Sequence, residues 1–215
     1  MAKRKDPKAR REAARQRMYH DLIFEAAEQV FADRGFESGT MQDVAAESGV
    51  SLKTLYATFP GKNELYDEIR TSRGEELMDA IASAADGAAG PLDELERSVR
   101  AYVEFLVAHP NFLRVMLADG MAWALAKASS QTEGVEGFAR VLQQGMDEGL
   151  FHRGDPKLMA RIGVAIMQVW LARIPEARDP DPAAIADEIM LQFRRLYLSG
   201  EADGDDTGTG DLEAA

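Results

Sequence analysis

The chain contains no cysteine and only three histidines among its 215 residues. Without cysteine it cannot form a disulfide framework, a thiolate metal site or a cysteine nucleophile. The histidines, His20, His109 and His152, lack the spacing of metal ligands, and the sequence has neither a glycine-rich phosphate loop nor a nucleophile elbow. These absences predict a protein that is not an enzyme and that holds no metal or cofactor.

Long apolar runs are also missing. No segment reaches the roughly 18 consecutive apolar residues that a membrane-spanning helix needs. The N-terminus is basic, but the apolar core of a secretory signal does not follow it. With 46% hydrophobic residues the chain can still bury one or two packed domains. We therefore expect a cytoplasmic protein with no membrane partner.

The charge is unevenly distributed along the chain. A net charge of −12 by itself argues against a nucleic-acid-binding protein. Residues 1–20, however, hold eight basic and two acidic side chains, and residues 1–62 carry a net charge of +2, which leaves −14 for residues 63–215. Attraction to phosphate acts over about 8 Å at physiological salt, so a basic end can bind DNA while an acidic body faces away.

Residues 40–62 have the pattern of a helix-turn-helix. Thr40 and Asp43 form a helix start signal, and Gly49 supplies the backbone freedom that ends the first short helix. Ser51 can cap a second helix over residues 52–59, in which Leu55 and Phe59 point inward at i and i+4. Two short helices around a glycine-containing turn are typical of a motif that enters a DNA groove.

This segment resembles the DNA-binding signature of the TetR (tetracycline-repressor-like) family of transcriptional regulators. The resemblance covers residues 17–65, and beyond it the similarity is architectural. The matching positions in and before the helix-turn-helix are Ile23, Ala26, Ala27, Phe31, Gly35, Phe36, Thr40, Val44, Ala45, Gly49, Val50, Ser51, Thr54, Leu55, Tyr56, Phe59, Lys62 and Leu65.

The resemblance implies a role for each polar residue of the motif. Backbone phosphates would be held by Thr40, Ser51, Tyr56 and Lys62. Base edges would be read by Gln42, Lys53, Thr54, Ala57 and Thr58, because glutamine can bond adenine, lysine can bond guanine, and methyl groups suit the thymine methyl. The small residues at 57 and 58 and the glycine at 61 depart from the side chains that the family often has there.

Helical periodicity and the absence of a long period-2 alternation predict an all-α fold, with a three-helix DNA-binding head and a larger helical body. The expected domains are a basic flexible arm (1–16), the helix-turn-helix head (17–62), an effector-binding and dimerisation body (63–200) and an acidic disordered tail (201–215). The arm is either a solubilising segment or, as its place before the head favours, an element that reaches phosphates or a minor groove.

The resemblance also implies an effector pocket between the helices of the body. Its candidate lining is aromatic and thioether-rich, although position by position plain core packing is the favoured explanation of such residues. With few internal charges, this lining favours a small neutral or weakly cationic hydrophobic effector over a polyanion. The candidates are Tyr102, Phe105, His109, Phe112, Met116, Trp123, Phe138, Met146, Met167 and Trp170.

The family forms homodimers through its last two helices, here expected at about 156–174 and 183–198. The candidate interface is the stripe of Ile185, Ile189, Phe193 and Leu196, with packing inside one chain as the alternative. The predicted function is that of a homodimeric repressor, released from a palindromic operator by its effector. The alternative is a constitutive or protein-partner-controlled DNA-binding or interaction module without a small-molecule ligand.

Overall fold

The computed structural model describes residues 7–118, 133–177 and 179–200, and the regular elements in these ranges are helical, which confirms the all-α fold class. No described helix has the length and apolar character needed to cross a membrane. The elements are α1 (Pro7–Ser38), α2 (Met41–Ser48), α3 (Leu52–Thr58), α4 (Lys62–Ala85), α5 (Pro91–Ala108), α6 (Pro110–Ala118), α8 (Glu133–Asp147), α9 (Pro156–Leu171), the 3-10 turn η1 (Ile174–Glu176) and α10 (Pro182–Tyr197).

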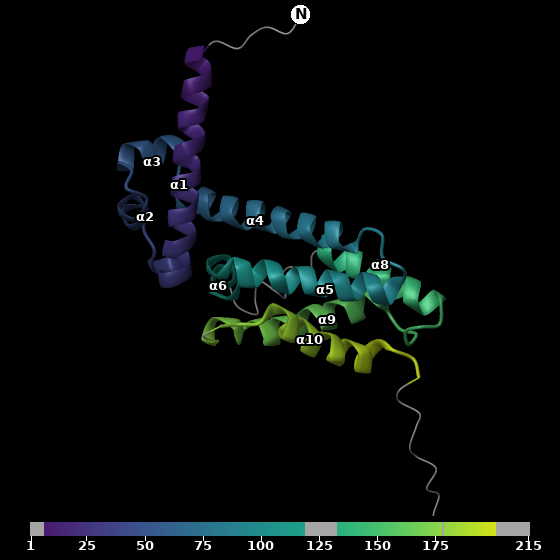
Figure 1. Ribbon diagram of the computed structural model, residues 1–215. Helices are drawn as coiled ribbons and strands as arrows, with labels where there is room; N and C mark the ends of the chain where they lie inside the picture. The colour runs from purple at the N-terminus through teal and green to yellow at the C-terminus, as the bar shows by residue number, and fades with distance from the viewer. Residues whose placement is uncertain (1–6, 119–132, 178, 201–215) are drawn as a thin grey trace, which may run out of the picture.

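The helices form a head and a body that meet at α1 (Figure 1). Helices α2 and α3 lie on one side of α1, and α4 leads from the head across to the body. Helix α5 packs between α4 and α10, while α8 packs on α9, so the body is a layered bundle. Helix α6 packs directly against α1 and gives the body a second contact with the head.

Helix α1 starts earlier in the chain than expected and is kinked near its C-terminal end. The backbone kinks at Gly35 (φ 73°, ψ 164°), and helical structure continues to Ser38. At the other end the helix begins at Pro7, so the expected flexible arm is wrong for residues 7–16. A packed helix already provides the nucleus, and each further residue then adds a hydrogen bond at little cost. The expected disorder of residues 1–6 and 201–215 lies outside the described residues.

The head is built around one apolar centre. Its fully buried side chains include Ile23 of α1, Val44 of α2 and Leu55 of α3, each with none of its surface exposed. Tyr66 of α4 packs edge-on against Phe31, with ring centroids 5.4 Å apart. The first turns of α4 therefore belong to the head, and the helix carries the head's position into the body.

The dimer stripe expected on the last helix is largely an internal surface. Ile189 and Phe193 are 0% and 1% exposed within a single chain, so the alternative of packing inside the chain holds for both. Ile185 is half-buried and Leu196 is 45% exposed. Helix α10 contacts α5 and α9 at once, and its most apolar stripe fills the space between them. An amphipathic stripe shows that a face is buried without showing which partner covers it.

Helices α8 and α9 approach each other closely at Gly163. The ring of Phe138 packs on Phe193 with centroids 5.6 Å apart and edge-on to Tyr197 at 6.1 Å. A Cβ atom on Gly163 would lie 2.5 Å from Cε1 of Phe138 and 2.7 Å from the Tyr197 hydroxyl oxygen. The glycine is thus required by the packing of these two rings.

We expect Gly163→Ala to lower the free energy of unfolding by about 1–3 kcal/mol, the usual cost of overpacking a closed core. The matched control is Gly137→Ala in α8, where an added Cβ meets no described atom within 4 Å. The control should raise stability by about 0.5–1 kcal/mol, because alanine is the better helix former. Urea denaturation measures both. Equal effects of the two substitutions would contradict the close approach at Gly163.

Candidate nucleic-acid interface

The first helix of the motif is held by a complete capping box. The Thr40 hydroxyl oxygen accepts a hydrogen bond from the Asp43 backbone N–H (3.1 Å), and the Asp43 carboxylate accepts from the Thr40 backbone N–H (3.0 Å). The same carboxylate accepts from the Thr40 hydroxyl (2.7 Å) and pairs with Arg34 of α1 (2.6 Å). These bonds, those from Thr40 first, hold the pKa of Asp43 below its usual value. Thr40 therefore orients α2 before any phosphate arrives.

The turn and the second helix match the expected pattern. Gly49 adopts the left-handed conformation (φ 69°), and Ser51 accepts a hydrogen bond from the Thr54 backbone N–H (3.1 Å) as the N-cap of α3. The side-chain oxygens of Ser51 and Thr54 are 2.9 Å apart, and the Thr58 hydroxyl donates to the Thr54 carbonyl (3.0 Å). The hydroxyls of Thr54 and Thr58 are thus bonded within the helix, and both residues are half-buried.

The face of α3 that points to solvent carries a side chain that sequence reasoning missed. Leu55 and Phe59 are buried, whereas Lys53, Tyr56 and Ala57 are exposed as expected. Beside them Leu52 is also 39% exposed at the first helical position. Its position four residues before Tyr56 puts both on one face of the helix. The sequence held one signal for this side chain, because Leu52 is an apolar residue that does not belong to the buried pair of Leu55 and Phe59.

Lys62 and Gln42 lie at the two edges of the motif. Gln42 is exposed in the first turn of α2. The Lys62 ammonium donates to the Glu37 carbonyl (3.2 Å) and lies 4.4 Å from the centre of the Phe36 ring. Gly61 precedes it as an N-cap without a side-chain bond, so the first N–H groups of α4 have no side-chain partner at that cap. Lys62 is thus held in place at the start of a helix, where anions are favoured.

The described candidate pocket residues belong to two pairs of helices, α5 with α6 and α8 with α9, and their hydrophobic side chains all pack in or against one apolar core. Between α5 and α6 the rings of Phe105 and His109 stack with centroids 4.1 Å apart, and Phe112 packs edge-on to Phe105. Burial raises the pKa of the nearby α5 residue Tyr102 to about 12, and its hydroxyl has no hydrogen-bond partner among the described residues. Met116 is half-buried on α6.

The second group belongs to the α8 and α9 layer. Phe138 is packed on Gly163 and Phe193, and Met146 and Met167 are buried in the core. Trp170 is half-buried at the end of α9, beneath the guanidinium of Arg173 (5.1 Å to the ring centre). Trp123 lies outside the described residues. In this state these side chains contribute to packing.

A groove of about 250 Å³ opens elsewhere, on the surface between α5 and α10. Two ion pairs cross it, Arg100 with Asp187 (2.9 Å) and Arg194 with Glu96. None of the candidate pocket residues lines it. Its charged, open character does not match an apolar effector site.

Comparison with known proteins bears on the head and on the whole chain. A family model described as "Bacterial regulatory proteins, tetR family" matches residues 23–69, which span α2, α3 and the adjoining parts of α1 and α4. The HTH-type transcriptional regulator YfiR of Bacillus subtilis is 30% identical over 145 residues, which cover 62% of this chain and 68% of that protein. The HTH-type transcriptional repressor SCO4008 of Streptomyces coelicolor is 24% identical over 184 residues, or 81% and 92% of the two chains.

The fold has a counterpart among solved structures. A TetR-like transcriptional regulator from Rhodococcus sp. RHA1 superposes with a TM-score of 0.69 at 25% identity, over 82% of this chain and 94% of that one. These relatives are regulators of transcription, which confirms the prediction that the protein is not an enzyme. With its helix-turn-helix head, its helical body and these matches, the chain belongs to the TetR family of bacterial transcriptional regulators.

Proposed function

We propose that the protein is a homodimeric repressor that binds a near-palindromic operator and leaves it when a small hydrophobic effector enters the body. The observation that carries the proposal is the exposed face of α3, held by its Ser51 cap and by the capping box of α2. A two-turn reading helix contacts only a few base pairs, so useful specificity requires two heads about 34–36 Å apart on the duplex. SCO4008 and a second relative, KstR2 of Mycobacterium tuberculosis, are named as repressors.

Specificity and affinity are divided between different side chains of the motif. Gln42, Lys53 and Ala57 face solvent and are suited to base edges, and the side chains of Gln42 and Lys53 make no hydrogen bond within the described residues. Thr54 and Thr58 offer methyl groups, because their hydroxyls are bonded within the helix. Thr40 and Ser51 are assigned to phosphates through the helix N-termini that their hydroxyls cap. Tyr56 and Lys62 are assigned to phosphates through their side chains. Leu52 adds an apolar contact for a thymine methyl or a sugar.

Selection from random duplexes tests this function directly, and an enriched palindrome is the expected result. On that operator, Tyr56→Phe and Lys62→Gln should weaken binding to all sequences alike. Gln42→Ala should instead reduce the preference for one base pair, at one operator position, by about 1–3 kcal/mol. Binding titrations on the operator and on single-base variants measure both. Failure to enrich any palindrome, with and without candidate ligands, would rule out the proposed function.

The dimer interface is assigned to exposed apolar side chains of α9 and α10, a set that keeps only Leu196 of the expected stripe. Leu158, Ile162 and Val169 are 54%, 46% and 65% exposed on one face of α9, and Leu191 and Leu196 of α10 are 48% and 45% exposed. Five large apolar side chains open to water on two adjacent helices mark an interaction surface. A second copy covers such a face in a four-helix bundle.

We expect Val169→Asp to convert the dimer into a monomer, because the partner would have to bury an unpaired carboxylate. Met18→Asp on α1, also at an exposed apolar side chain, is the matched control and should leave the dimer intact. Sedimentation velocity separates the two states. A dimer that survives both Val169→Asp and Leu191→Asp would place the interface elsewhere.

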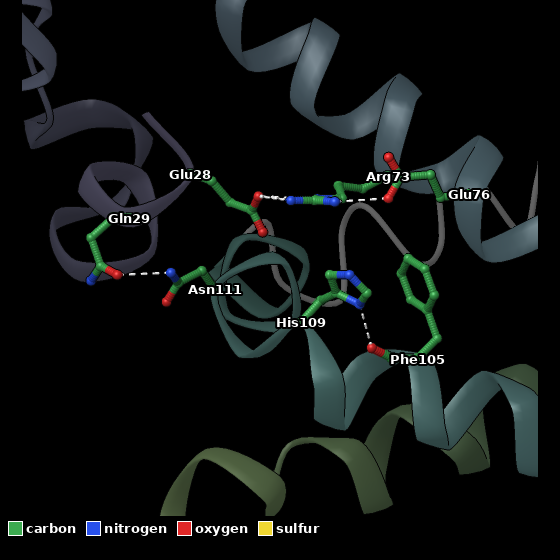
Figure 2. A network of polar contacts seen from close by, with 7 residues as sticks. All are labelled: Glu28, Gln29, Arg73, Glu76, Phe105, His109 and Asn111. Carbon is green, nitrogen blue, oxygen red and sulfur yellow. Dashed lines mark hydrogen bonds and ion pairs between the residues drawn. The ribbon is translucent and has the colours of Figure 1, made fainter. Parts of the chain in front are cut away.

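The head is connected to the body by a small polar network (Figure 2). Glu28 of α1 is 5% exposed and accepts hydrogen bonds from Nε and Nη2 of Arg73 on α4 (3.0 and 2.9 Å). Arg73 also pairs with Glu76 (2.8 Å). On the α6 side, Asn111 donates to Gln29 of α1 (2.7 Å). Because such bonds are directional, a shift of α4 or α6 changes the orientation of the head.

The candidate effector residues at the α5–α6 turn adjoin this network. His109 donates from Nδ1 to the Phe105 carbonyl (2.8 Å) at the α5–α6 turn, two residues before Asn111. An effector that displaces the Phe105 and His109 rings therefore moves α6 and strains its bond to α1. The ligand acts through its different affinity for the two states. The structural neighbour AibR has been solved with isovaleryl coenzyme A and operator DNA, and KstR2 is described as a ketosteroid regulator.

A thermal-shift panel of neutral hydrophobic compounds, fatty acids and acyl-coenzyme A thioesters should yield a stabilising compound that also releases DNA. A ligand at a hundredfold excess over its Kd stabilises by about 2.7 kcal/mol. Asn111→Ala should keep that stabilisation and weaken the release, since it cuts the link between α6 and α1. Arg97→Ala, on the outer face of α5, is the control. Release by acyl-coenzyme A thioesters or other polyanions, with none by the uncharged hydrophobic compounds, would contradict a neutral hydrophobic effector.

A constitutive or protein-controlled regulator is the second candidate. It shares the DNA-binding head and differs only in the body. A body that no compound of the panel stabilises, on a protein that still selects a palindrome, would favour this candidate over the ligand-relieved repressor.

A further inference from the structure

The first turns of α1 extend beyond the head. From residue 8 to residue 17 every side chain is exposed, so this part of the helix packs on no other element. In Figure 1 it continues past α3, away from the body. Its base is attached next to α3, where the rings of His20 and Phe59 lie with centroids 5.1 Å apart. We call residues 7–17 the helical extension.

The helical extension is strongly basic, although the chain as a whole is acidic. It carries five basic residues and one acid, Glu12, which pairs with Arg15 (2.8 Å). The side chains of Arg10 and Arg11 make no ion pair or hydrogen bond within the described part of the chain. The basic residues are Lys8, Arg10, Arg11, Arg15 and Arg17. Exposed, unneutralised guanidinium groups on one end of an acidic protein are complementary to a polyanion.

The helical form decides how this surface can meet DNA. A helix with its side chains is about 10–12 Å wide, while the minor groove of B-DNA is about 6 Å wide. The extension therefore cannot lie in a minor groove as a flexible arm does. Eleven helical residues span about 16 Å, enough to pass from a reading helix in the major groove to the phosphates beside it.

We propose that the helical extension is a second DNA-binding element, which grips backbone phosphates outside the half-site that α3 contacts. This inference rests on the proposed operator binding and adds to it a contact that needs no base sequence. The charges surround the helix, since Lys8, Arg11 and Arg15 follow one stripe and Arg10 and Arg17 lie on the opposite side. Such an arrangement suits phosphates, which accept hydrogen bonds from many directions.

The test compares two duplexes, one ending at the half-sites and one with about six further base pairs on each side. Wild-type protein should bind the longer duplex more tightly. Arg10→Gln/Arg11→Gln should bind both alike, and its dependence of log Kd on log salt should fall by about 0.9 per lost phosphate contact. The matched control, Arg97→Gln/Arg153→Gln, removes two positive charges from the body and should behave as wild type.

A second variant separates a rigid helix from a flexible chain. Ala13→Gly/Ala14→Gly keeps every charge and weakens the helix, so it should lose part of the gain on the longer duplex. Unchanged binding by this variant would refute the helical presentation. If wild type binds the operator and Arg10→Gln/Arg11→Gln matches the control on both duplexes, the extension proposal is wrong. If wild type selects no operator at all, the proposed function fails and this inference with it.

Discussion

The buried carboxylate of Glu28 constrains how the two parts of the protein can be joined. A charge with so little exposure must stay paired, and removing its partner costs about 3–5 kcal/mol in comparable buried pairs. Arg73 supplies both hydrogen bonds from the middle of α4, while its guanidinium also lies 5.2 Å from the centre of the Phe24 ring. Helix α4 is therefore fixed to α1 at their crossing, and the α6 contact at Gln29 fixes α1 a second time. Two contacts prevent the free rotation that one alone would allow.

In the DNA-binding head, too, most polar side chains are hydrogen-bonded within the protein. Thr40, Ser51 and Thr58 use their hydroxyls to hold their own helices, and Asp43 collects bonds from Thr40 and Arg34. The head is consequently ordered before it binds DNA, which lowers the entropic cost of binding. Few polar side chains then remain to bond bases, so contacts to methyl groups and phosphates contribute a larger share of DNA binding. A basic element outside the half-site compensates for a sparse reading surface by adding affinity without sequence preference.

The parts that the sequence predicted well are governed by local chemistry. The Thr40 cap, the helix end at Gly49 and the Ser51 cap each depend on neighbours a few residues away, and the structure has all three. The parts that differ depend on partners far along the chain. Ile189 and Phe193 are apolar at helical spacing whether a second copy or α5 and α9 cover them. The charge of the basic residues after Pro7 predicted a flexible arm, whereas their helical form depends on the packed helix that follows residue 17.

The exposure of Leu52 could not be predicted from the apolar pattern of the helix alone. In a globular helix an exposed leucine needs no explanation when it stands alone. Here it stands beside Tyr56, and both are more than a third exposed. Leu55 is buried, Lys53 and Ala57 face solvent, and Leu52 and Tyr56 lie along the edge between these two sides of the helix. The exposed apolar pair is therefore part of the contact surface, and apolar contact with thymine methyl groups becomes a substantial share of what this head can distinguish.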